Sequence, residues 1–204
     1  MQGFEVVIQI AILIMSVVIH EVSHGVIAYW LGDPTAKYAG RLTLNPIPHI
    51  DLVGSILVPA VGFFLGGFII GWAKPVPYNP NNLSNQRWGP ALVGAAGPAS
   101  NIIVALLFSL SLRISGAAMS ETLFTVLATI VLINILLAIF NLVPIPPLDG
   151  SKVLFALLPY DSYRFQEALE QYGLFILLLF IFYIWPMVSP IIEVLFRLFT
   201  GISL

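Results

Sequence analysis

Long apolar stretches restrict the fold of this chain more than any other feature of its sequence. They cover approximately residues 4–31, 52–72, 91–112, 122–143 and 173–196. A helix of roughly 20 mostly apolar residues is long enough to cross the hydrocarbon core of a bilayer. Only 9% of the 204 residues are charged, whereas soluble domains carry about 25%. We therefore expect an all-α polytopic membrane protein, with residues 1–204 forming a single membrane-embedded domain.

Residues 52–72 differ from the other apolar stretches because they contain five glycines and a proline. These residues weaken a straight spanning helix, so the stretch is either a fifth span or a re-entrant hairpin. Its flanks, residues 40–45 and 74–78, predict short extended or β segments. Residues 160–172 mix charged side chains with tyrosines, which is typical of a helix that lies in the membrane interface.

The segment His20-Glu21-Val22-Ser23-His24 is an HExxH motif inside the first apolar stretch. Residues four apart lie on one face of a helix, so both imidazoles can bind a single Zn²⁺. Glu21 lies beside them and can accept a proton from water. An isolated histidine in a membrane helix is usually a hydrogen-bonded packing residue or part of a proton path. Three ionisable residues in five positions are costly in a bilayer, however, and indicate a functional site.

A catalytic zinc ion usually has three protein ligands, and Asp149 is the main candidate for the third. It follows the fourth apolar stretch in a segment with three prolines, which can direct the carboxylate back toward the bundle. Alternatively, Asp149 is the N-cap of a helix that begins near Ser151. His49 is another candidate, either as a ligand or as a residue at the rim of the cleft. A histidine so close to Asp51 is more often part of a hydrogen-bonded turn.

Asparagines in the apolar stretches raise a further question. Asn101 follows a run of small residues that allow helices to approach closely. It is either an interhelical hydrogen-bonding residue or part of the substrate site. Asn134 and Asn141 pose the same question, and Asn141 is the stronger candidate because it borders the proline-rich segment.

An HExxH motif in a membrane helix, followed by N-x-x-P-x-P-x-x-D-G from Asn141 to Gly150, resembles the site-2 protease family of intramembrane zinc metalloproteases. Residues 40–51, 71–77 and 97–101 are similar to its short prokaryotic branch, which lacks PDZ and CBS domains. The resemblance covers most of residues 16–155. In one respect the chain departs from the pattern, because several relatives have a spanning helix before the HExxH helix.

The resemblance implies a role for each matching residue. It implies that His20, His24 and Asp149 bind one Zn²⁺ per chain and that Glu21 is the catalytic base. It also implies that Asn141 helps to hold the substrate strand. Asn101 and His49 are further substrate-site candidates, proposed from their positions in the sequence and not from the resemblance. The expected substrates are single-span membrane proteins, and the expected location is a prokaryotic plasma membrane.

The position of the motif predicts the topology. About 14 apolar residues precede His20 and about seven follow His24, so the metal lies nearer the face where this helix ends. Asp149 reaches the same face only if residues 52–72 are re-entrant. That arrangement places six basic residues on one side and two on the other, which fits the positive-inside rule better than the four-to-four division of a five-span chain. We therefore predict four spanning helices, a re-entrant hairpin and an active site near the cytoplasmic face.

Other functions agree less well with the sequence. A zinc-dependent ion or metal transporter usually has polar positions along several helices, whereas this chain concentrates them at one depth. A non-catalytic scaffold has no use for Glu21. The net charge of −2 gives no basic surface for nucleic acid, and the absence of cysteine excludes thiol catalysis.

Overall fold

All regular structure in the described part of the chain is helical. The computed structural model describes residues 2–57, 73–115 and 119–202. The longer helices are α1 (Gln2–Trp30), α4 (Gly89–Ser115), α5 (Glu121–Asn141), α7 (Tyr163–Leu179) and α8 (Trp185–Thr200). The short helical elements are α2 (Thr35–Tyr38), η1 (Ile47–His49), η2 (Leu52–Leu57), η3 (Pro80–Asn82), α6 (Gly150–Leu157), η5 (Tyr160–Ser162) and η6 (Phe180–Ile184). The prediction of an all-α fold is confirmed.

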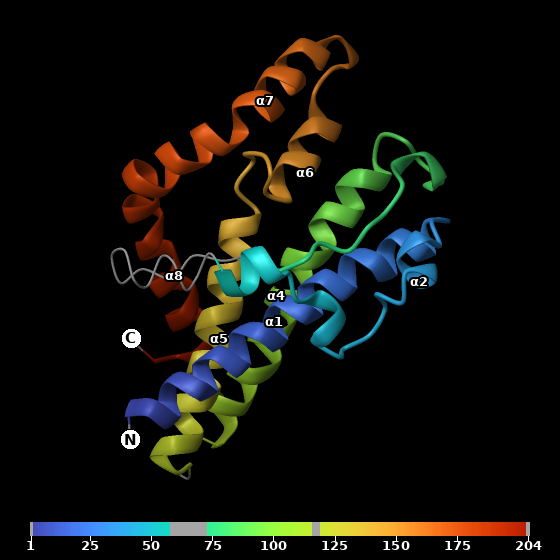
Figure 1. Cartoon of the computed structure of the whole chain (residues 1–204). Helices are drawn as coiled ribbons and strands as arrows, with labels where there is room; N and C mark the ends of the chain where they lie inside the picture. The colour runs from blue at the N-terminus through green and yellow to red at the C-terminus, as the bar shows by residue number, and fades with distance from the viewer. Residues whose placement is uncertain (1, 58–72, 116–118, 203–204) are drawn as a thin grey trace.

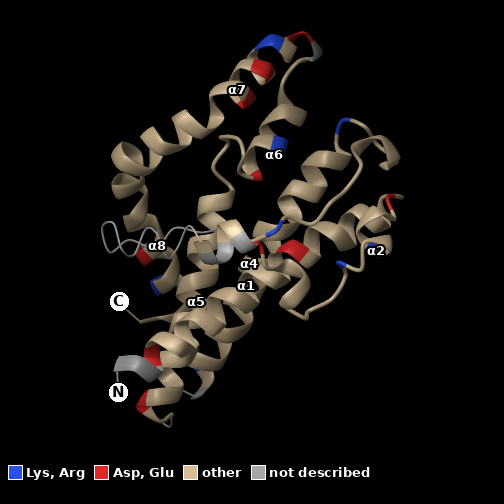
Figure 2. Ribbon diagram, in the orientation of Figure 1, with Lys and Arg blue, Asp and Glu red and all other residues tan. Residues whose placement is uncertain are grey.

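Four helical segments in these ranges are long and apolar enough to cross a bilayer. They are Glu5–Trp30, Gly89–Ile114, Glu121–Asn141 and Tyr163–Thr200. The number agrees with the four spans predicted from the sequence. Charged residues gather toward the two ends of the bundle, around α2, α6 and the start of α7 at one end and near the N-terminus at the other (Figure 2).

The bundle is organised around α4, which packs against α1, α5, α6 and α8 (Figure 1). A buried apolar cluster joins α4, α5 and α8. Its fully buried members are Ala105, Leu112, Leu127, Val131, Ile135, Ile192 and Phe196. Because α1 also packs against α5, the helix that carries the HExxH motif is in contact with two other long helices, α4 and α5.

The last helical region differs from the sequence prediction. We expected an interfacial helix over residues 160–172 and a span over 173–196. Instead, α7, η6 and α8 follow one another without interruption, and the direction changes near η6 (Figure 1). Pro186 lies at the start of α8 and has no N–H to bond the carbonyl of Phe182, which accounts for a distortion at η6 and not near residue 172.

The predicted re-entrant hairpin falls largely on residues 58–72, which lie outside the described residues. Residues 52–57 form the short helix η2. Neither flank, 40–45 or 74–78, contains a strand in the structure as described. The two flanks are nevertheless joined, because Lys74 N donates to His49 O at 2.9 Å and Arg41 Nη2 donates to Lys74 O at 2.5 Å.

Candidate metal centre

The two histidines of the HExxH motif lie one turn apart on the inner face of α1. Their ring centroids are 4.7 Å apart, and both side chains are buried. Gly97 of α4 lies directly against both rings. A Cβ atom at Gly97 would come within 2.5 Å of His20 Nε2 and 2.6 Å of His24 Cε1. Only glycine therefore allows α4 to pack against both imidazoles.

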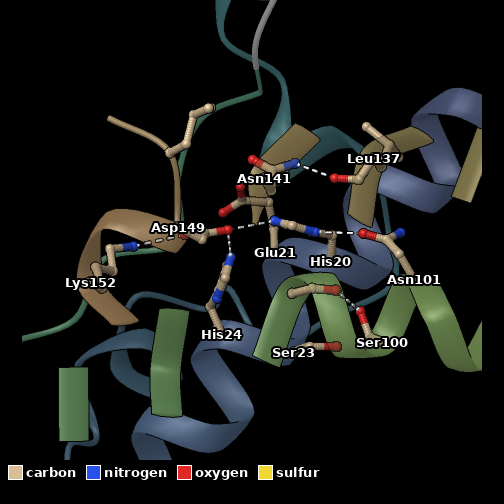
Figure 3. Close-up of polar contacts among 12 residues, drawn as sticks. His20, Glu21, Ser23, His24, Ser100, Asn101, Leu137, Asn141, Asp149 and Lys152 are labelled. Carbon is tan, nitrogen blue, oxygen red and sulfur yellow. Dashed lines mark hydrogen bonds and ion pairs between the residues drawn. The ribbon is translucent and has the colours of Figure 1, made fainter. Parts of the chain in front are cut away.

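The Nδ1 atoms of both histidines are hydrogen bonded to α4. His24 Nδ1 donates to the Val93 carbonyl at 2.6 Å. His20 Nδ1 lies 2.6 Å from Asn101 Oδ1 (Figure 3). Metal-binding histidines characteristically use their second nitrogen in this way, which orients the ring and leaves Nε2 for the metal.

Asp149 faces the two histidines from the residue before α6. Its Oδ2 lies 3.0 Å from His20 Nε2 and 3.1 Å from His24 Nε2, while Oδ1 accepts from Lys152 Nζ at 2.9 Å (Figure 3). Asp149 occupies the N-cap position of α6, yet its side chain makes no capping hydrogen bond. The positive charge of Lys152 Nζ beside Oδ1 favours the ionised form of Asp149, which is the form that can bind a metal.

These three atoms fit a zinc ion by their chemistry. The Val93 carbonyl can only accept, so His24 Nδ1 carries a proton and a neutral ring presents a lone pair at Nε2. That lone pair faces the Asp149 carboxylate, and His20 presents the same situation to the same oxygen. Facing lone pairs repel unless a cation lies between them. One Zn²⁺ bound by two imidazoles and one carboxylate relieves both contacts at once, and this is a zinc donor set.

Glu21 lies next to the histidines and is held by a different segment. Its Oε2 accepts from the backbone N–H of Val76 at 2.8 Å. The ligand atoms of Glu21, His20 and His24 lie within 4.8 Å of one another. Glu21 is half-buried. One of its carboxylate oxygens is oriented by the Val76 N–H, and the group remains close to the two histidines.

A cavity of about 160 Å³ opens onto these groups. Its lining includes Asn141, which is the last residue of α5 and donates from Nδ2 to Leu137 O at 2.9 Å (Figure 3). Pro75, Val76 and Tyr78 line the cavity as well. Since one water occupies roughly 30 Å³, there is room for a few waters or a short piece of extended peptide.

The structure does not bring Asn101 and His49 to this cavity. Asn101 has no exposed surface and lies behind His20. His49 is also buried, and its Nε2 donates to Thr43 O at 3.0 Å while Nδ1 faces Arg41 at 3.4 Å. These contacts correspond to the hydrogen-bonded turn that we considered for His49.

Sequence reasoning missed several groups that contact the site. Two of them are backbone atoms, the Val93 carbonyl and the Val76 N–H, and a backbone atom leaves no mark in a residue pattern. Lys152 was also missed, although it is three residues after Asp149 at the start of a helix and such pairs lie close together. The four-residue spacing of Val93, Gly97 and Asn101 would have indicated one face of α4 directed at the two histidines.

Comparison with known proteins gives consistent results. The sequence model of the family described as "Peptidase family M50" matches residues 110–181. This range contains Asn141 and Asp149 but not the HExxH motif.

Individual relatives extend the similarity over most of the chain. The chain is 37% identical over 203 residues to a Bacillus subtilis protein named "Putative zinc metalloprotease YwhC", covering 93% of this chain and 90% of the relative. It is 29% identical over 170 residues to a Mycolicibacterium smegmatis protein named "Putative zinc metalloprotease Rip2", covering 83% and 64%. The Mycobacterium tuberculosis protein of the same name is 28% identical over 176 residues, covering 86% and 67%. No solved structure matched the chain.

Proposed function

The chain belongs to peptidase family M50, the site-2 protease family, and we propose that it is an intramembrane zinc metalloprotease. Its reaction is the hydrolysis of peptide bonds in membrane-spanning substrate helices near the cytoplasmic face. The observation that carries this proposal is the convergence of His20, His24 and Asp149 beside Glu21 at one cavity.

The residues around the cavity divide the work between binding and proton transfer. His20 Nε2, His24 Nε2 and Asp149 Oδ2 would hold the zinc, which supplies a Lewis acid that acidifies water and polarises a carbonyl group. Glu21 accepts the proton from the attacking water and later donates it to the leaving amine. The Val76 N–H holds Oε2 of Glu21 at 2.8 Å, which keeps the other carboxylate oxygen available for this transfer.

The substrate must lie in the cavity with its backbone exposed. A helix hides its carbonyls in internal hydrogen bonds, so the substrate unwinds before cleavage. Residues 74–78 border the cavity through Pro75, Val76 and Tyr78 and are not helical. We propose that they and residues 40–45 offer an edge to which an extended substrate is added. Asn141, at the same cavity, contacts the substrate strand.

The proposed topology places the loops on both sides of the re-entrant segment at the cytoplasmic face. Its support comes from three contacts at the ends of the bundle. The His49–Lys74 hydrogen bond joins the chain before residue 50 to the chain after residue 73. Arg87 Nε donates to Ala156 O at 2.9 Å near α6, whereas Arg113 Nε donates to Phe199 O at 2.6 Å at the opposite end. Such a division gives the six-to-two distribution of basic residues that the positive-inside rule favours.

The decisive experiment replaces the proposed base by Glu21→Gln. Glutamine keeps the size and accepts the Val76 hydrogen bond but cannot accept a proton at neutral pH. General base catalysis is worth roughly 10²–10⁴-fold, so kcat should fall by about that factor while zinc content and substrate affinity stay close to wild type. The assay is digestion of a single-span substrate in liposomes, with zinc measured on the same sample. Cleavage at the wild-type rate would refute the mechanism, and several exchangeable ions per chain would favour the transporter.

A labelling experiment tests the topology. The chain has no cysteine, so single cysteines at Lys37 and Asn81, both exposed, can be labelled with an impermeant reagent from either side. We expect both to react from the cytoplasmic side only. Reaction from opposite sides would restore a fifth span.

A further inference from the structure

A chain of buried side-chain amides connects His20 to a backbone carbonyl on another helix. Asn101 of α4 and Asn134 of α5 have no exposed surface, and neither is among the residues that line the cavity. Asn101 Nδ2 donates to Asn134 Oδ1 at 2.8 Å, and Asn134 Nδ2 donates to Ile130 O at 2.8 Å. With the His20 contact, the chain passes through α1, α4 and α5.

The direction of every hydrogen bond in this chain follows from one fixed end. A backbone carbonyl can only accept, so Asn134 must turn its NH₂ group toward Ile130 O. Its Oδ1 then faces Asn101 and accepts a hydrogen bond from Asn101 Nδ2. Asn101 Oδ1 therefore faces His20, where it accepts from Nδ1 at 2.6 Å. A neutral His20 is thus restricted to the tautomer with a proton on Nδ1 and a lone pair on Nε2.

Ser16, one turn before His20 on α1, supports the same orientation of both amides. Its hydroxyl lies 2.9 Å from Asn134 Nδ2, and its carbonyl lies 3.4 Å from Asn101 Nδ2. The carbonyl again can only accept, which independently directs Asn101 Nδ2 away from His20. All the polar atoms of both amides therefore have partners, as a buried network requires.

We propose that Asn101 and Asn134 form an amide relay that fixes the tautomer and ring orientation of His20, and that both are positioning residues for zinc affinity. The inference rests on the zinc site of the proposed function and assigns the asparagines a role in metal binding, not in substrate binding. His24 receives the same constraint directly from the Val93 carbonyl. Both histidines are thereby oriented by backbone carbonyls. His24 is hydrogen bonded to one directly, whereas His20 is connected to one through the amides of Asn101 and Asn134.

A measurement of zinc affinity distinguishes the proposed relay from a purely structural role in which the two asparagines only hold the helices together. If the asparagines only hold helices together, their loss lowers thermal stability and leaves the zinc dissociation constant of the folded protein unchanged. If they form the relay, removing either residue lowers zinc affinity, and the loss is smaller for Asn134, which is farther from His20. The variants are Asn101→Leu and Asn134→Leu, which keep the bulk but remove the amide. Ser109→Ala is the matched control, because Ser109 is a buried polar residue on α4 that bonds only the Leu106 carbonyl of its own helix.

The full chain is purified in detergent, and zinc affinity is measured by chelator competition. Loss of an outer hydrogen-bonding partner of a ligand typically costs 10–100-fold in metal affinity. We expect the loss of zinc affinity in Asn101→Leu to fall in that range, Asn134→Leu to lose about tenfold, and Ser109→Ala to match wild type. The visible spectrum of the Co²⁺-substituted protein should change in Asn101→Leu, because the His20 ring is released from its orientation.

Wild-type zinc affinity and an unchanged Co²⁺ spectrum in folded Asn101→Leu would overturn the inference. If that variant does not fold, Asn134→Leu decides. A wild-type spectrum and wild-type zinc affinity in Asn134→Leu would exclude the relay. A wild-type chain that binds no zinc would remove the proposed function itself, which is a different result from failure of the relay alone.

Discussion

The histidine side and the aspartate side of the metal centre are held by different kinds of contact. His20 and His24 lie on a long helix inside the bundle, and their Nδ1 atoms are hydrogen bonded to α4. Asp149 ends the segment 142–149, which has no regular helix. Its second oxygen binds Lys152, whose side chain is 30% exposed. His20, His24 and Asp149 are all buried, and the two sides differ in their supporting groups, which are buried behind the histidines and partly exposed behind Asp149.

Apolar packing replaces buried hydrogen bonds on the aspartate side. Leu148 forms a buried cluster with Leu177 and Phe180, which belong to the α7–η6 region. Gly173 of α7 lies so close to Pro146 that a Cβ atom there would be 2.6 Å from its carbonyl oxygen. The segment that carries Asp149 thus packs on α7, outside the core formed by α1, α4 and α5. The comparison teaches that the proposed site combines two ligands positioned by the bundle with one ligand positioned by a peripheral helix.

The largest effects should come from removing one ligand on each side. Both His24→Ala and Asp149→Ala should weaken zinc binding by more than about 100-fold, since even outer partners contribute 10–100-fold. Only His24→Ala should also lower the melting temperature of the zinc-free protein, because it removes a buried ring that packs against Gly97 and is hydrogen bonded to the Val93 carbonyl. Metal analysis and thermal denaturation measure both effects.

His49→Ala is the control for that pair and should keep its zinc. Full zinc retention in Asp149→Ala together with loss in His49→Ala would transfer the third ligand position to His49. Equal destabilisation by His24→Ala and Asp149→Ala would remove the contrast between the two sides.

A smaller effect is expected from Lys152→Met. The substitution removes the 2.9 Å contact with Asp149 Oδ1 but keeps the apolar stem. Because the lysine is partly exposed, zinc affinity should fall by about tenfold, the lower end of the range for outer partners. Lys37→Met is the matched control, since Lys37 is exposed and donates to Tyr29 OH. Zinc affinities that are the same in both variants would show that Asp149 needs no partner at Oδ1.

The smallest effect on zinc should come from Gly173→Ala, which tests the support from α7. Overpacking of this kind costs about 1–3 kcal/mol, and the displaced segment should reduce zinc affinity by less than tenfold. Leu174→Ala, at a residue that is 66% exposed, should change neither stability nor zinc affinity. A Gly173→Ala protein with reduced stability and wild-type zinc affinity would show that α7 stabilises the fold without supporting Asp149.

Much of the bundle could be predicted because long apolar runs leave few alternatives in a membrane. The observed bounds of α1, α4 and α5 lie within a few residues of the predicted stretches. The end of the chain could not be divided correctly, since the polar and apolar parts of residues 160–196 form one continuous helical region. Composition changes at residue 172, but no residue there interrupts the helix.

The candidate site was partly predictable for a similar reason. The four-residue spacing of His20 and His24 places them together on any helix, whereas the approach of Asp149 was only an expectation from its proline-rich surroundings. The sequence alone could not show whether Asn101 and Asn134 belong to the site or only form hydrogen bonds between helices. The distances in the structure show that Asn101 faces His20 and that Asn134 faces Asn101.

The repeat of Val93, Gly97 and Asn101 along α4 has a consequence for how this protein can change in evolution. These residues recur every four positions opposite two histidines with the same spacing. One inserted residue between 97 and 101 would rotate Asn101 by about 100° about the helix axis and separate it from His20. The segment 50–73 differs in this respect, because the residues at its two ends, His49 and Lys74, are hydrogen bonded to each other and a change of length between them leaves that contact in place. Insertions and deletions among related sequences should therefore accumulate in residues 50–73 and be absent from residues 93–101.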